Sequence, residues 1–412
     1  MLRSARSYAF VVPRFGESIV GGAETLVGAL ASKLAARGDH VEVFATCAKD
    51  NRTWENAFPP GESIEFGIPV TRFPVDARNL DVWVRHQIRL NDGIPLTLEE
   101  QLEWMENSVS SSALYAHLRS QVSRFDAYFF APYLFGTTFW GSLVCPEKSF
   151  LIPCLHDEQN AYVDVIASMF RQVRGAVFNA VPEGELACRL YGTIEGGAVG
   201  MGFEPYPAAE VQALSPYFAS SEPYILYLGR KETGKNAQVL IDYFIKAKDS
   251  DARLSKLKLV IAGGGSFSDL LRPAAAGRAD IIDLSHVSEQ DKRRLLKHAL
   301  VLCQPSTNES FSIVLMEAWL LGCPALVHAA CPVTKHHVME SGGGLFFGSQ
   351  SDFAAVVLEL LENATLRARM GQAGFQYVRE QYNWDAVIER FDKVMEGFQL
   401  DRELPAPSTS PR

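Results

Sequence analysis

The residues best suited to chemistry are four charged side chains in the second half of the chain, each following an apolar run. Arg230 and Lys235 come after YILYLG, and Glu309 and Glu317 come after ALVLCQP. At the end of a strand, an arginine fork and a lysine point charge could converge on a diphosphate, whereas the ordinary alternative is a solvated turn. The two acids are about two helical turns apart. What the two acids can do depends on the elements that position them.

The segment that must position both acids begins as a polar loop at Pro305 and continues as an apolar helix. We expect this helix to run from Phe311 to Leu321, where Gly322 and Pro324 end it. An apolar run stands before the loop and another after the helix, which predicts a right-handed βαβ unit of a parallel sheet.

Glu309, Ser310, Phe311 and Ser312 would place free backbone N–H groups and the positive end of this helix beside a ligand. The helix leaves little solvent face, and an unpaired buried carboxylate is costly, so Glu317 is expected to face that ligand. The alternatives are a capping acid at position 309 and a surface acid at position 317.

Three further loops could contact a ligand, because open α/β sheets bind ligands beyond the carboxyl ends of their strands. Gly263 and Gly264 follow LKLVIA and permit close approach to the backbone, although an ordinary turn has the same sequence. Gly22 lies in GGAE before a predicted helix, where close helix packing is the alternative. His156 ends a predicted strand beside two acids. The alternative to a functional role is that it is a structural histidine.

Two successive α/β series supply these loops. The first runs from YAFVVP to GGAVGMGFE, with an irregular, partly helical insert, and the second starts at PYILYLGR. Residues 205–221 lack periodicity and are predicted to be a linker, and Ser288 is predicted to cap a helix. We therefore expect an α/β fold of two Rossmann-like domains facing a cleft.

Composition limits the classes of function. The chain has 412 residues with 39 basic and 48 acidic side chains, a net charge of −9, so no overall field attracts nucleic acid. Seven scattered cysteines without CxxC predict reduced thiols in a cytoplasmic protein and no zinc site. No secretory signal or membrane span is recognised, and residues 400–412 are predicted to be a disordered tail.

Taken in order, these motifs resemble the retaining GT-B glycosyltransferases of glycosyltransferase family 4 (glycosyl transferases group 1). The likeness is strongest from Tyr224 to Trp384 and rests on GRKETGK, AGGG, SHVSEQDKRRLLKHALVLCQPS and the E-x7-E element. In the first half, GGAE, LHDE and GAVGMGFE match. The resemblance implies an amino-terminal acceptor domain at residues 1–203 and a nucleotide-sugar donor domain at 204–383. A closing helix at about 384–399 would cross back to the amino-terminal domain.

The resemblance also implies roles for the residues. Arg230 and Lys235 would hold the donor diphosphate, Glu309 the donor sugar and Glu317 the ribose. His156 would lie at the reacting centre near the acceptor. The remaining donor contacts would come from backbone groups and the base pocket, at Gly22, Gly263, Gly264, His286, Val287, Ser310, Phe311, Ser312 and Ile313.

The implied reaction transfers a sugar with retention, by front-side attack, with no metal and no cofactor beyond the sugar nucleotide. The acceptor would be a glycan, a lipid-linked molecule or a small molecule in surface polysaccharide or glycoconjugate synthesis, with peripheral membrane contact open. Two departures stand out: Ser312 replaces a frequent glycine, and Gly234 replaces a frequent acid. The insert at residues 80–120 has no counterpart and is a candidate for acceptor selection.

Two other functions stay open. One is a GT-B sugar-nucleotide epimerase, against which the E-x7-E element argues. The other is a catalytically silent glycan- or nucleotide-binding protein, against which the retained cations and acids at 230, 235, 309 and 317 argue. A dehydrogenase is disfavoured because the first βα turn lacks GxGxxG.

Overall fold

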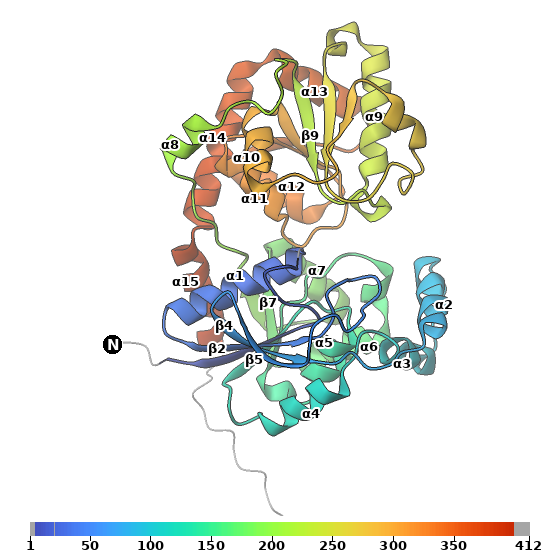
Figure 1. Ribbon diagram of the computed structural model, residues 1–412, viewed down its shortest axis with the longest axis vertical. Helices are drawn as coiled ribbons and strands as arrows, with labels where there is room; N and C mark the ends of the chain where they lie inside the picture. Colours follow the sequence, from blue (N-terminus) through green and yellow to red (C-terminus); the bar gives the residue numbers. More distant parts are fainter. Residues whose placement is uncertain (1–4, 20, 399–412) are drawn as a thin grey trace, which may run out of the picture. The chain divides into compact units, whose positions relative to one another are not determined.

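The computed structural model describes residues 5–19 and 21–398, and it divides into two compact α/β units (Figure 1). The first unit takes in the chain as far as Met201 together with the chain from Val387 onward, and the second is Gly202–Ala386. The predicted tail at 400–412 lies outside the described residues.

The first unit is built on an eight-stranded sheet of order β3-β4-β2-β1-β5-β6-β7-β8, in which only the β3–β4 pair is antiparallel. Its strands are β1 Ser7–Val12, β2 His40–Thr46, β3 Gly61–Glu65, β4 Ile68–Phe73, β5 Ala127–Phe130, β6 Ser149–Leu151, β7 Gly175–Phe178 and β8 Gly196–Ala198. Its α-helices are α1 Gly22–Ala36, α2 Leu80–Asn91, α3 Leu98–Glu106, α4 Ser112–Ser120, α5 Gly136–Ser142, α6 Asp164–Gln172 and α7 Val181–Tyr191. The expected helical insert is therefore present as α2, α3 and α4.

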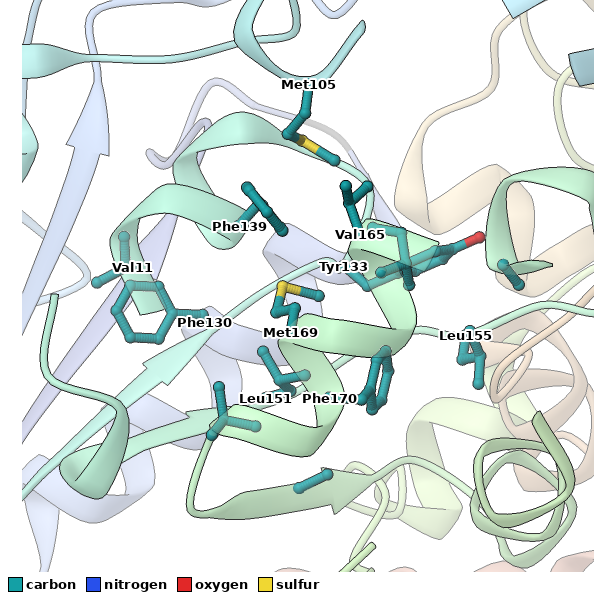
Figure 2. Close-up of a cluster of buried hydrophobic side chains, with 14 of the residues drawn as sticks. Val11, Met105, Phe130, Tyr133, Phe139, Leu151, Leu155, Val165, Met169 and Phe170 are labelled. Atoms are coloured by element: carbon teal, nitrogen blue, oxygen red, sulfur yellow. The ribbon is translucent and has the colours of Figure 1, made fainter. Parts of the chain in front are cut away.

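Each face of this sheet is covered by side chains from separate elements. On one face, Val11 and Phe130 pack among residues of α5 and α6, including Phe139 and Met169 (Figure 2). On the other face lie Tyr8 and Phe129. Successive residues of one strand point to opposite faces, so these strands are buried on both sides and read as continuous apolar runs.

The last helix, α15 Trp384–Gly397, covers the face that carries Tyr8 and Phe129. The Phe391 ring lies 5.8 Å from the ring of Tyr8 and 5.6 Å from that of Phe129. Arg37, the residue after α1, donates to both carboxylate oxygens of Asp392 at 2.9 Å. The closing helix thus returns to the amino-terminal unit, as the resemblance implied.

The second unit has a six-stranded parallel sheet of order β11-β10-β9-β12-β13-β14. Its strands are β9 Tyr224–Leu228, β10 Lys258–Ala262, β11 Ile281–Asp283, β12 Val301–Gln304, β13 Ala325–His328 and β14 Gly344–Phe347. Its α-helices are α8 Ala208–Ala213, α9 Ala237–Ser250, α10 Glu289–His298, α11 Ile313–Leu320, α12 Pro332–Ser341, α13 Gln350–Glu362 and α14 Ala364–Gln381. Both series of the sequence are thus parallel-sheet α/β units, which confirms the predicted fold class.

Strand β9 shows how this second sheet is buried on both faces. Ile225 and Tyr227 pack with α9 and α13, whereas Leu226 and Leu228 pack with α10 and α11. Residues 205–221 were expected to be a linker without periodic structure, and this was wrong in one respect, because the segment contains α8. Partly buried side chains of this segment, among them Val211 and Tyr217, pack on the same core cluster as Leu226, which gives the segment a fixed course.

Candidate functional site

The loops after β9 and β12 meet because these two strands are neighbours in the sheet. Lys235 Nζ lies 2.8 Å from Glu309 Oε1, and Gln304 Nε2 donates to the same oxygen at 2.9 Å. Asn236, in the left-handed conformation at φ +59°, also donates to Pro305 O at 3.1 Å. Two of the expected catalytic residues are therefore in direct contact at the carboxyl end of the sheet.

Arg230 has a different carboxylate partner. Its Nη1 lies 3.1 Å from Glu232 Oε1, and 55% of its side chain is exposed. The Tyr227 hydroxyl donates to Arg230 O at 2.7 Å and so fixes the backbone at the start of the loop. The structure gives the two cations separate acids, and their convergence on one diphosphate stays a prediction.

The turn at Gly263 and Gly264 packs tightly on the loop after β9. Gly263 has φ +138°, and a Cβ there would lie 2.1 Å from Gly229 O, so glycine is required for the close approach of the two turns. At Gly264, by contrast, a Cβ would meet nothing within 4 Å. Gly263 therefore has a packing role of its own, and Gly264 is the position open to a ligand.

Lys231 is a structural residue that the motif reading missed. It is fully buried, its ammonium donates to Gly263 O, and Nζ lies 3.1 Å from Asp283 Oδ1. Its own N–H donates to Gly264 O at 2.7 Å. One lysine thus joins the loops after β9 and β10 to the end of β11. Nothing in its spacing indicates this, because the sequence does not show which loops are adjacent.

His286 and Val287 lie in the loop between β11 and α10. Ser288 caps α10, as predicted, with its hydroxyl accepting from Asp291 N at 3.1 Å. Gly263 N donates to Ser285 O at 2.9 Å. The loop that would flank a base is consequently attached to the glycine turn.

Helix α11 begins at Ile313, so the expected start at Phe311 was wrong. Ser312 adopts the left-handed conformation, with φ +73°, and this break excludes Phe311 from the helix. The Phe311 ring is buried against Tyr382 and His337, with centroids 5.2 and 5.5 Å away. None of the four residues expected to present helix-end N–H groups lies within the helix: residues 309–311 belong to the loop and Ser312 is the N-cap. Ile313, the other expected backbone contact, is the first helical residue.

Glu317 has a protein partner. Its Oε1 lies 2.8 Å from Lys292 Nζ, and the two side chains are 16% and 17% exposed. Burial raises the pKa of the Glu317 carboxyl, and the Lys292 charge opposes this shift. The premise that Glu317 would have no partner within the protein was therefore wrong. Contact with a ribose stays a prediction on other grounds.

Gly22 belongs to the first unit and is the first residue of α1. A Cβ there would meet nothing within 4 Å, so its backbone can be approached. Glu24, two residues further on, forms an ion pair with the guanidinium of Arg14, and Arg14 Nη1 donates to Lys49 O at 2.9 Å. The GGAE motif is thus anchored through its acid to the loop after β1.

His156 also belongs to the first unit and follows β6. Its Nδ1 lies 3.8 Å from Glu158 Oε1, which accepts a hydrogen bond from the Tyr133 hydroxyl at 2.8 Å. The side chain is 26% exposed. The neighbouring Asp157 pairs with Arg189 at 2.5 Å. The histidine is held near a carboxylate and keeps an accessible ring.

A second residue that sequence reasoning missed, Glu183, fixes the segment that carries His156. The carboxylate of Glu183 is completely buried and accepts from Leu155 N at 2.6 Å and from Asn179 N. Burial raises its pKa to about 8, against the lowering effect of these backbone donors. An acid in the first turn of α7 reads as a helix cap, so its link to Leu155 could not be seen from spacing.

The whole architecture matches solved glycosyltransferases. Sucrose-phosphate synthase from Thermosynechococcus elongatus is similar with a TM-score of 0.71 and 16% identity, over 96% of this chain and 100% of that chain. Anabaena HepE, solved in complex with UDP and glucose, gives 0.68 and 13% identity over 95% and 100%. At these identities the likeness establishes the fold, and that fold is GT-B.

The match to a protein family lies in the second unit. Residues 215–377 match the model of the glycosyl transferases group 1. A phosphatidyl-myo-inositol mannosyltransferase of Mycobacterium leprae is 32% identical over 178 residues, which are 42% of this chain and 46% of that protein. The chain spans about half the length of the curated relatives it matches.

Among residues 5–19 and 21–398, no helix is both long and apolar enough to cross a membrane.

Proposed function

We propose that this protein is a retaining glycosyltransferase that moves a sugar from a nucleotide-diphosphate sugar to an acceptor hydroxyl without a metal ion. The observation that carries the proposal is the 2.8 Å contact between Lys235 and Glu309 at the carboxyl ends of β9 and β12. It brings a cation suited to a diphosphate next to an acid suited to sugar hydroxyls, on the unit that matches the group 1 model.

In this proposal, Lys235 exchanges its carboxylate partner for the donor diphosphate when the donor binds. Its charge then stabilises the leaving nucleoside diphosphate as the bond from the anomeric carbon to oxygen breaks, a role that a fixed ammonium can fill in place of a divalent cation. The acceptor oxygen forms the new bond on the same face, and its proton passes to the departing phosphate. Glu309 accepts hydrogen bonds from the donor sugar, and His156 lies by the acceptor.

The acceptor and the base are proposed only as classes. Relatives include GDP-mannose-dependent mannosyltransferases that act on phosphatidylinositol monomannoside, and HepE was solved with UDP, so guanosine and uridine donors are the first to test. We propose a glycan, lipid-linked or small-molecule acceptor and a role in polysaccharide or glycoconjugate synthesis. A cytoplasmic or membrane-peripheral location is in keeping with the seven free cysteines.

The test is a thermal-shift and donor-turnover screen against UDP-, GDP-, ADP- and dTDP-sugars in the presence of EDTA. We expect one nucleotide to raise the melting temperature and its sugar donor to release that nucleotide slowly despite EDTA. Analysis of the transferred sugar should show the anomeric configuration of the donor. Absence of binding and turnover with all four donors would overturn the proposal. Turnover that EDTA abolishes would overturn the metal-independent part alone.

A further inference from the structure

The ion pair between Lys292 and Glu317 bridges the two helices whose leading loops carry candidate donor contacts. Lys292 lies one turn into α10, which begins after the loop of His286 and Val287. Glu317 lies in α11, which begins after the loop of Glu309. The pair therefore connects the predicted base loop with the predicted sugar loop.

This contact has a defined geometry in a largely enclosed setting. Lys292 Nζ lies 2.8 Å from Glu317 Oε1 and also 2.8 Å from Glu289 Oε2. The Glu289 side chain is 74% exposed, whereas Glu317 is 16% exposed. The exposed acid can be solvated by water, so the buried one depends more strongly on the ammonium.

The charges around Glu317 come from two elements. Lys292, Glu289 and Arg293 lie on α10, and Tyr206 precedes α8 with its ring under the Arg293 guanidinium, 4.9 Å from the ring centroid. Burial opposes the charge of Lys292, but the Glu317 and Glu289 carboxylates outweigh it and raise the pKa of the ammonium. Lys292 is therefore charged at neutral pH, and its ammonium stabilises the negative charge of Glu317 in a buried helix.

We propose that Lys292 is a positioning residue for nucleotide binding: it keeps Glu317 ionised and fixes Oε1, so that Oε2 is presented to a ribose hydroxyl. This inference rests on the proposed function. A freely rotating or protonated carboxyl would lose a charge-assisted hydrogen bond to the ribose, and such bonds are about twice as strong as neutral ones. Lys292 acts through Glu317 and makes no contact with the reacting atoms.

A double-mutant cycle tests this mechanism directly. The variants are Lys292→Met, Glu317→Gln and the double variant, and the probes are UDP and GDP, with binding measured by calorimetry. We expect each single variant to weaken binding of the cognate diphosphate by about tenfold, and the double variant to bind no worse than Glu317→Gln. Donor KM should rise while kcat stays within about twofold, because the ribose is remote from the bond that breaks.

Three further variants separate positioning from fold stability. Lys292→Arg keeps the charge and should restore most of the affinity. Glu289→Gln removes only the exposed partner of the same ammonium and should bind as wild type. Lys292→Gln keeps a hydrogen-bond donor without the charge, and it serves if Lys292→Met does not fold; about tenfold weaker binding is expected there too.

The outcomes distinguish this inference from the proposed function. If wild type binds UDP or GDP and Lys292→Met or Lys292→Gln binds equally well, the positioning role is wrong and the glycosyltransferase proposal stands. Additive losses in the double variant would mean that Lys292 contacts the nucleotide itself, which also overturns positioning. If wild type binds neither diphosphate while Lys235→Ala behaves as wild type, both proposals fail.

Discussion

Lys235 Nζ and Glu309 Oε1 lie 2.8 Å apart although 74 residues separate them in the chain. The lysine is only partly enclosed, with 29% of its side chain exposed, while the acid is 10% exposed. The contact can therefore open toward solvent on the lysine side without unpacking the unit. A ligand that competes for the ammonium meets a carboxylate that Gln304 continues to hold.

Lys235→Ala should lower kcat/KM by about a hundredfold or more, because it removes a charge that stabilises the leaving diphosphate. Since Gln304 still donates to Glu309, the loss in free energy of unfolding should stay below about 2 kcal/mol. Steady-state kinetics and denaturant unfolding check the two parts. Lys246→Ala, an exposed lysine on α9, is the control and should match wild type. Turnover near wild type in Lys235→Ala would contradict the diphosphate assignment.

Ser312→Gly should raise the free energy of unfolding by about 0.5–1 kcal/mol. The wild-type serine pays a conformational penalty at φ +73°, which glycine avoids. Its hydroxyl is also buried with no hydrogen-bond partner among the described residues. Ser312→Ala removes only the hydroxyl and keeps the backbone penalty. Urea unfolding of both variants separates the two effects, and a glycine variant no more stable than the alanine variant would show that the backbone is unstrained.

Lys231→Ala should destabilise the second unit by about 3 kcal/mol, because it leaves a cavity and removes the contacts that join the loops after β9 and β10 to the end of β11. Lys231→Met preserves most of the side-chain volume and leaves Asp283, whose side chain is 30% exposed, to be solvated. The free energy of unfolding lost in Lys231→Met should therefore be clearly smaller than that lost in Lys231→Ala. Denaturant unfolding provides the comparison. Equal losses in the two variants would mean that the polar contacts of the ammonium, and not its volume, stabilise this region.

Acid should destabilise the second unit through His337. Complete burial, with a smaller effect of His336, lowers the pKa of His337 to about 3, against about 6.5 in an unfolded chain. The unfolded state therefore binds a proton as the pH falls through 6.5 and the folded state does not. Stability is fully present above that pH and is lost below it, by about 2 kcal/mol between pH 7 and pH 5.

The measurement is urea unfolding at pH 7 and pH 5 for wild type and His337→Asn. The asparagine side chain can replace Nδ1, which lies 2.9 Å from the Tyr377 hydroxyl. The variant should be less stable at pH 7, but its loss between the two pH values should be about 2 kcal/mol smaller than that of wild type. An identical pH dependence in both proteins would show that His337 is not the group that takes up the proton.

The two α/β series could be predicted from the sequence because most of the parallel strands are apolar runs followed by glycine or polar loop residues. The start of α11 could not, since the left-handed backbone of Ser312 is set by packing of Phe311 against Tyr382 and His337. The residue types on both sides of Ser312 form one apolar pattern, so the sequence does not indicate the break there. The helix α8 was missed for a similar reason, as its apolar contacts are with distant residues.

The candidate site divides in the same way. The motif order predicted Lys235 and Glu309 as site residues because each follows a strand, and the structure brings the two side chains into contact. Lys231, Lys292 and Glu183 were missed, since their partners are 52, 25 and 28 residues away and belong to other elements. Which loops become neighbours follows from a strand order in which β12 lies beside β9, and no local periodicity encodes that order.

The return of α15 to the first unit has a consequence for biosynthesis. The second unit, Gly202–Ala386, is complete before Phe391 is translated, whereas the sheet of the first unit waits for that ring to cover Tyr8 and Phe129. The half that is translated first therefore cannot complete its core until the chain of the other half has been synthesised. A nascent chain arrested before Phe391 would expose this face and be a target for chaperones.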